Sequence, residues 1–163
     1  MSFREDLEKW LQDCSKLVIL GIGNPLRGDD AVGIRILRLL RGRVPRNVKL
    51  IEGGMVPENF IGKIKLFNPS HILLIDAADF GGQPGEVRLI SPERIVGITL
   101  STHALPLHVI AELINATISA KIMLFGIQPK NLNLGEEVSP EIKVAIRESA
   151  ETILEVLSKI VRP

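Results

Sequence analysis

The sequence has little cysteine, no marked excess of charge of either sign, and no long uninterrupted hydrophobic run. Cys14 is the only cysteine among 163 residues, which excludes an internal disulfide and any zinc site built from several cysteines. A reducing compartment, the cytoplasm, suits such a chain. The 20 basic and 19 acidic residues nearly cancel, so neither a polyanion-binding surface nor a disordered chain is indicated.

Hydrophobic segments that could enter a membrane are also missing. The longest apolar stretch, residues 95–111, is interrupted by polar residues, two histidines and a proline, a mixture that a membrane helix would not tolerate. The first residues are amphipathic, so no signal peptide is expected. The four arginines between positions 35 and 43 are spaced like the solvent-facing side of one helix, so they do not indicate nucleic-acid binding.

The hydrophobic pattern predicts one α/β domain, residues 1–163, folded as a three-layer α/β/α sandwich with a five-stranded sheet. Strands are expected at 16–22, 47–51, 72–75, 86–90 and 122–127, and helices at 3–14, 32–40, 57–67, 106–118 and from 140 onward. Only about nine residues separate Asp76 from the fourth strand, too few for a parallel crossover. That strand is therefore predicted to be antiparallel, at the edge of a mostly parallel sheet.

A glycine-containing loop joins the first predicted strand to its helix and reads Gly-Ile-Gly-Asn-Pro-Leu-Arg-Gly-Asp-Asp at 21–30. A dinucleotide fingerprint would occupy this position, but its third glycine is displaced and two aspartates stand at the start of the helix. Carboxylates there would repel a phosphate and attract a cation. Asp29 is predicted to cap the helix, which leaves Asp30 to point into the crevice above the sheet.

Two further side chains are expected at the same edge of the sheet. Asp76 ends the third strand, where open α/β sheets place ligand-contacting groups; the alternative is a turn-forming role, which Asp79 could share. His103 lies on a loop before a helix, whereas the other two histidines fall in ordinary packing positions. Together Asp30, Asp76 and His103 would make a three-ligand site with open positions, suited to zinc or nickel.

Three motifs together resemble those of the hydrogenase maturation proteases: the loop at 21–30, Leu-Leu-Ile-Asp-Ala-Ala-Asp at 73–79 and Ser-Thr-His at 101–103. Their order and intervals match over nearly the whole chain. Segments 52–59 and 125–129 resemble the branch that processes the large subunits of hydrogen-evolving, membrane-associated hydrogenases, the hydrogenase 3 maturation endopeptidases.

The resemblance implies a cytoplasmic, metal-dependent endopeptidase that removes the C-terminal extension from a [NiFe]-hydrogenase large-subunit precursor after nickel insertion. Asp30, Asp76 and His103 match the family's metal-site positions, and the resemblance implies that nickel is supplied by the substrate and that no nucleotide is needed. It also admits nickel-insertion chaperones as partners. Residues 3–14 resemble an addition to relatives that begin at the first strand, and Ala31 stands where many members have glycine.

Two other functions could use the same crevice. A metal- or nucleotide-binding chaperone would bind its ligand there without cutting a bond. A conventional zinc hydrolase would hold its own metal and cut generic peptides. Neither a His-Glu-x-x-His nor a Gly-x-Ser-x-Gly motif occurs in the sequence.

Overall fold

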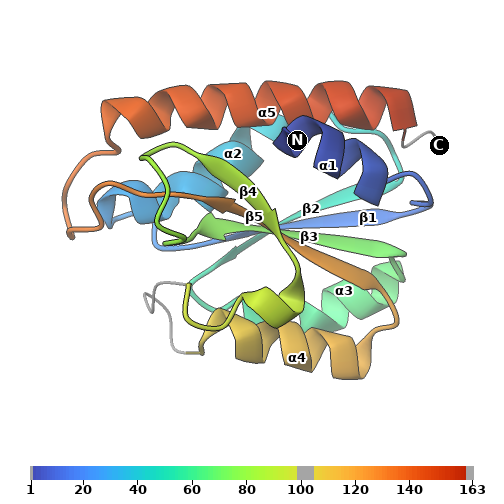
Figure 1. The fold of residues 1–163 in the computed structure, drawn as a ribbon. Coiled ribbons are helices and arrows are strands. Elements are labelled where there is room, and N and C mark those ends of the chain that lie inside the picture. The colour runs from blue at the N-terminus through green and yellow to red at the C-terminus, as the bar shows by residue number, and fades with distance from the viewer. Residues whose placement is uncertain (1, 99–104, 161–163) are drawn as a thin grey trace.

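The computed structural model describes residues 2–98 and 105–160, which form one mixed sheet with helices on both faces (Figure 1). The strands are β1 (Leu17–Ile22), β2 (Val48–Gly54), β3 (His71–Ala77), β4 (Val87–Ile90) and β5 (Lys121–Ile127). The helices are α1 (Phe3–Trp10), α2 (Val32–Leu40), α3 (Ile61–Phe67), α4 (Leu107–Thr117) and α5 (Pro140–Ile160), with short 3-10 turns η1 (Gly28–Ala31), η2 (Pro57–Phe60) and η3 (Pro92–Arg94). The predicted three-layer α/β/α sandwich is confirmed.

The sheet has the strand order β2-β1-β3-β5-β4. The first four strands in that order pair in parallel, whereas β4 pairs antiparallel with β5 and places Val87 opposite Ile127. The predicted reversal at the sheet edge is therefore confirmed. Strands β1 and β3 are buried along their whole length, as expected for central strands covered by helices on both faces.

Two hydrophobic clusters fill the spaces on either side of the sheet. Helices α1, α2 and α5 cover one face, and α3 and α4 cover the other (Figure 1). On the first face, α1 contributes the fully buried Leu7 and an edge-on contact between Phe3 and Phe125, with ring centroids 5.5 Å apart. Helix α1 is thus part of the main core.

Two predicted helices differ from the structure by more than one residue at an end or in helix type. Helix α1 ends at Trp10 rather than at Cys14, because the chain turns toward β1 and the Ser15 and Lys16 amides donate to Ser70 Oγ at 3.0 and 3.2 Å. The predicted helix at 57–67 begins as the 3-10 turn η2 and continues as α3, a common arrangement at helix starts. Among the described residues, no helix is long and apolar enough to cross a membrane.

Candidate functional site at the carboxyl edge of the sheet

Two predicted site residues, Asp30 and Asp76, lie at the carboxyl edge of neighbouring strands. Strand β1 pairs with β3, and Gly21 lies opposite Ile75, so Asp76 directly follows that last pair. Asp30 belongs to η1, which follows β1 and contacts β3. The strand pairing therefore brings both acids to one edge of the sheet, as the sequence predicted.

Asp30 is almost fully buried, with 1% of its surface exposed. Its Oδ2 accepts a hydrogen bond from the Asn24 amide at 2.7 Å, and its own amide donates to the Arg27 carbonyl at 3.0 Å. Gly23 has a φ of +134°, and a Cβ there would lie 2.0 Å from the Asp30 carbonyl oxygen. Only glycine fits this close approach, which fixes Asp30 against the end of β1.

The structure separates the roles of Asp76 and Asp79. Asp76 is 1% exposed, lies within β3 opposite Gly126, and accepts a hydrogen bond from the Ala77 amide at 2.8 Å. Asp79 is exposed, and its Oδ1 accepts from the Gly81 amide two residues later at 3.2 Å. The turn-forming role therefore belongs to Asp79, and Asp76 is the acid at the strand end.

The predicted helix-capping role of Asp29 is wrong. Asp29 is fully buried inside η1, and its carboxylate accepts hydrogen bonds at 2.7–2.8 Å from the amides of Lys130, Asn131 and Ser139 and from the Ser139 hydroxyl. These four hydrogen bonds hold the carboxylate in one orientation. Asp29 thus ties the loop after β5 to the loop after β1.

Gln128 is a further residue at this edge that the sequence analysis did not assign. Its side-chain oxygen accepts from the Phe80 and Gly82 amides at 2.9 and 3.0 Å, and its Nε2 donates to Asp79 Oδ1 at 3.1 Å. This buried amide fixes the loop that follows Asp76. In the sequence, only its place in segment 125–129 singled out Gln128. Its role could not be predicted, because its hydrogen-bond partners lie 46 to 49 positions away.

The third predicted ligand, His103, lies outside the described residues. Ile98, the last described residue before His103, lies at the same edge of the sheet, because its carbonyl accepts a hydrogen bond from the Asp79 amide at 2.7 Å. Within residues 2–98 and 105–160, no group of three or more histidine, cysteine, aspartate or glutamate side chains could hold a metal ion. Asp30 and Asp76 supply carboxylate oxygens, which together with one imidazole would suit nickel or zinc.

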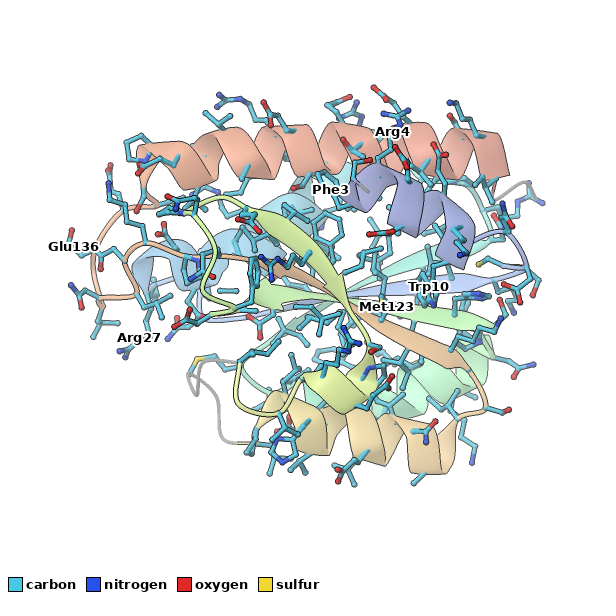
Figure 2. The ribbon with its side chains drawn as sticks, in the orientation of Figure 1. Phe3, Arg4, Trp10, Arg27, Met123 and Glu136 are labelled. Carbon is cyan, nitrogen blue, oxygen red and sulfur yellow. The ribbon has the colours of Figure 1, made fainter. Side chains whose placement is uncertain are left out.

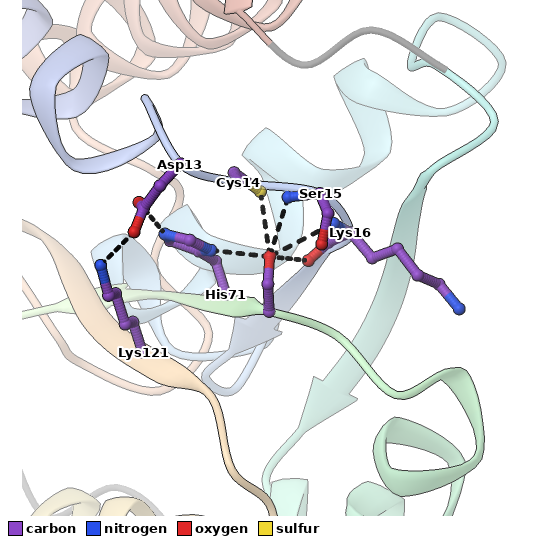
Figure 3. A network of polar contacts seen from close by, with 7 residues as sticks. Asp13, Cys14, Ser15, Lys16, His71 and Lys121 are labelled. Atoms are coloured by element: carbon purple, nitrogen blue, oxygen red, sulfur yellow. Dashed lines mark hydrogen bonds and ion pairs between the residues drawn. The ribbon is translucent and has the colours of Figure 1, made fainter.

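His71 belongs to a separate polar network at the amino edge of the sheet (Figure 3). Its Nε2 lies 3.1 Å from Asp13 Oδ1, its Nδ1 lies 2.8 Å from Ser70 Oγ, and Asp13 also pairs with Lys121. Burial lowers the pKa of the His71 imidazole and outweighs the opposite effect of Asp13. The predicted packing role of His71 is therefore confirmed.

Comparison with known proteins identifies the family. The model of the hydrogenase maturation protease family matches residues 34–156. A protein of Methanocaldococcus jannaschii that carries the name of a hydrogenase maturation protease is 37% identical, over 96% of this chain and 97% of its own length. The hydrogenase 3 maturation protease of Escherichia coli is 34% identical, over 79% of this chain and 83% of its own length.

A solved structure gives the same result. The crystal structure of the [NiFe] hydrogenase maturation protease HycI from Thermococcus kodakarensis aligns with a TM-score of 0.86 and 38% identity, over 94% of this chain and 99% of that one. The fold is thus one that a protease, a peptide-bond hydrolase, also has. The chain belongs to the hydrogenase maturation protease family.

Proposed function

We propose that this protein is an endopeptidase that removes the C-terminal extension of a nickel-iron hydrogenase large-subunit precursor after nickel has been inserted. The observation that carries the proposal is the pair of buried acids, Asp30 and Asp76, at one edge of a fold shared with hydrogenase maturation proteases. Aspartate and glutamate carboxylates are common ligands of divalent metal ions in proteins. A cationic metal centre in the substrate would complement such a pair.

In this proposal nickel is part of the substrate. Asp30, Asp76 and His103 complete the coordination of a nickel ion that the precursor already holds, so the metal both marks the precursor as loaded and positions it. A precursor without nickel lacks the shared ligand and binds too weakly to be cut. This arrangement would make the protease a check on nickel insertion.

The bond is cut by water, and one of the two acids is suited to accept its proton. A carboxylate removed from bulk water is a competent general base when it lies within hydrogen-bond reach of the attacking water. The nickel ion supplies charge that polarises groups bound to it. An acid that accepts the proton and a nickel ion that polarises its ligands can act together. The aspartate substitutions below measure how much of the processing rate depends on the two carboxylates.

The test is processing of purified precursor, followed by mass spectrometry. Nickel-loaded precursor should be shortened and empty precursor left intact. Asp30→Asn, Asp76→Asn and His103→Ala should each slow processing by about a hundredfold or more. The matched control is Asp79→Asn, which keeps an oxygen acceptor in an exposed turn at the same edge and should process at the normal rate. Normal processing by all three site variants would overturn the site assignment.

The alternatives give different results in the same assay. A zinc hydrolase would contain zinc as purified and would cut generic peptides. A chaperone would bind precursor or nucleotide without shortening anything. Membership of a protease family argues against the chaperone, and the buried acids in η1, at the start of α2, disfavour nucleotide phosphate.

A further inference from the structure

Two exposed leucines project from neighbouring loops at the carboxyl edge. Leu26, in the loop after β1, is 68% exposed, and Leu134, in the loop after β5, is 65% exposed. The loops are joined directly, because the Gly135 amide donates to the Leu26 carbonyl at 2.8 Å. We call residues 24–29 and 130–139 the two-loop rim.

The two-loop rim is held in place by buried contacts. Asp29 accepts its hydrogen bonds from residues 130, 131 and 139, and its own amide donates to the Asn131 carbonyl at 2.7 Å. Gly28 has a φ of +52°, and a Cβ there would lie 2.4 Å from the Asn131 oxygen. The two loops therefore form one preorganised unit, and a ligand that binds it would not have to order it.

Arg27 adds an unused hydrogen-bond donor to this rim. Its Nε is buried yet has no hydrogen-bond partner within residues 2–98 and 105–160, a state that is unfavourable for a charged group. Figure 2 shows Arg27 at the same end of the molecule as Glu136, which belongs to the second loop of the rim. The Arg27 side chain as a whole is half-exposed, so a rotation of its guanidinium would bring this donor to a carbonyl oxygen of a peptide bound on the rim.

We propose that the two-loop rim is the docking surface for the precursor segment that is to be cut. That segment binds in extended form, covers Leu26 and Leu134 with its apolar side chains, and accepts a hydrogen bond from the reoriented guanidinium of Arg27 through a main-chain carbonyl. The inference rests on the proposed function, since it names the surface that delivers the scissile segment to the acid pair.

The position and chemistry of the two-loop rim favour a peptide segment of the precursor as its ligand. The rim is continuous with the site, because Asp29 immediately precedes Asp30 in η1. The exposed acids Glu136 and Glu137 follow Leu134 two and three residues later and would repel an anionic membrane surface. Two leucines beside an unsatisfied N–H donor match a peptide, which offers apolar side chains and carbonyl oxygens together.

The experiment measures the rate of processing against the concentration of nickel-loaded precursor. The double variant Leu26→Ser, Leu134→Ser should raise the half-saturating concentration at least about tenfold, because it removes apolar area buried on binding. The maximal rate should stay within about twofold, as expected when uniform binding is lost. Arg27→Met should raise the half-saturating concentration about fivefold.

Leu66→Ser is the matched control. Leu66 is 87% exposed but lies at the end of α3, next to the amino edge of the sheet, so its replacement should leave both kinetic constants unchanged. An unchanged half-saturating concentration in the double variant, or an equal rise in the control, would overturn the docking surface.

Binding of the precursor to immobilised protein separates this inference from the proposed function. If the wild type binds but does not cut, and the double variant binds at least about tenfold more weakly, the docking surface holds and the proposed function fails. If the wild type cuts and the double variant binds and cuts equally well, only the docking surface fails. Self-association of the wild type that the double variant loses would assign the rim to a second copy and would also overturn it.

Discussion

Asp29 and Asp30 are adjacent, equally buried acids with different contacts. The carboxylate of Asp29 is surrounded by four donors from the loop after β5, whereas Asp30 accepts from Asn24 in the preceding loop and stands beside the strand end that carries Asp76. The first acid organises the edge of the site. The second is the candidate ligand.

Replacing Asp29 by asparagine should destabilise the protein by about 3 kcal/mol, because the new amide points N–H groups at backbone donors and removes the charge that strengthens the bonds. Urea denaturation measures this loss. Glu136→Gln changes an exposed acid on the loop after β5, to which Asp29 is bonded, and should stay within about 0.5 kcal/mol of the wild type. Equal stability of the two variants would contradict the anchoring role of Asp29.

The sequence could not reveal that role. An acid at the start of a predicted helix is a common cap, and the true partners of Asp29 lie 101 to 110 positions away. By contrast, Asp76 was predictable because its place at the end of a buried strand follows from the hydrophobic run before it. The turn role of Asp79 depends on Gly81, two residues away, so its signal was local as well.

The buried imidazole of His71 gives a pH prediction. Its folded-state pKa is lowered, mainly by burial, so the unfolded chain binds a proton more readily than the folded one. Stability should therefore be greatest above the ordinary histidine pKa, about 6.5, and should fall as the pH drops through that value. The facing groups do not reverse this sign: Asp13 stays ionised because Lys121 lowers its pKa, and burial raises the pKa of the Cys14 thiol.

Chemical denaturation at pH 5 and pH 7.5 tests this prediction. His71→Gln should lose less stability than the wild type between the two pH values, since it has no imidazole to protonate. His108→Gln, which removes a half-exposed histidine of α4, should keep the wild-type difference. An identical pH dependence in His71→Gln and the wild type would show that His71 does not contribute.

At the scale of elements, the first helix has a clear structural role. Helix α1 packs against α5 and β4 and buries Leu7 completely. Leu7→Ala should lower the free energy of unfolding by about 3 kcal/mol through lost burial and a cavity, as measured by thermal denaturation. Lys9→Ala, on the exposed side of the same helix, is the control and should change it by less than about 0.5 kcal/mol.

The elements differ in how far the sequence predicted them. The antiparallel direction of β4 followed from the shortness of the connection after Asp76, a purely local constraint. The end of α1 could not be predicted in this way, because the apolar spacing continues to Cys14. The chain leaves the helix where the amides of Ser15 and Lys16 donate to Ser70, which lies 55 and 54 positions away in the sequence. Helix ends that depend on distant partners are not visible in periodicity.

At the scale of the whole molecule, the charges nearly cancel. With 20 basic and 19 acidic residues, the protein has no strong overall field to steer a charged partner. Raising the salt concentration from about 0.05 to about 0.5 M should change the second-order rate constant for precursor processing less than about threefold. A fall of about tenfold or more would show that local charges dominate the encounter.

The link between Asp29 and Ser139 also bears on how the protein is made. It joins residues 110 positions apart, and Ser139 immediately precedes the last helix, so the edge of the site cannot be assembled until most of the chain has left the ribosome. Contacts this distant in sequence form late in folding. A nascent or truncated chain would therefore contain Asp30 and Asp76 without the finished edge, and we expect proteolytic activity to appear only with the completed protein.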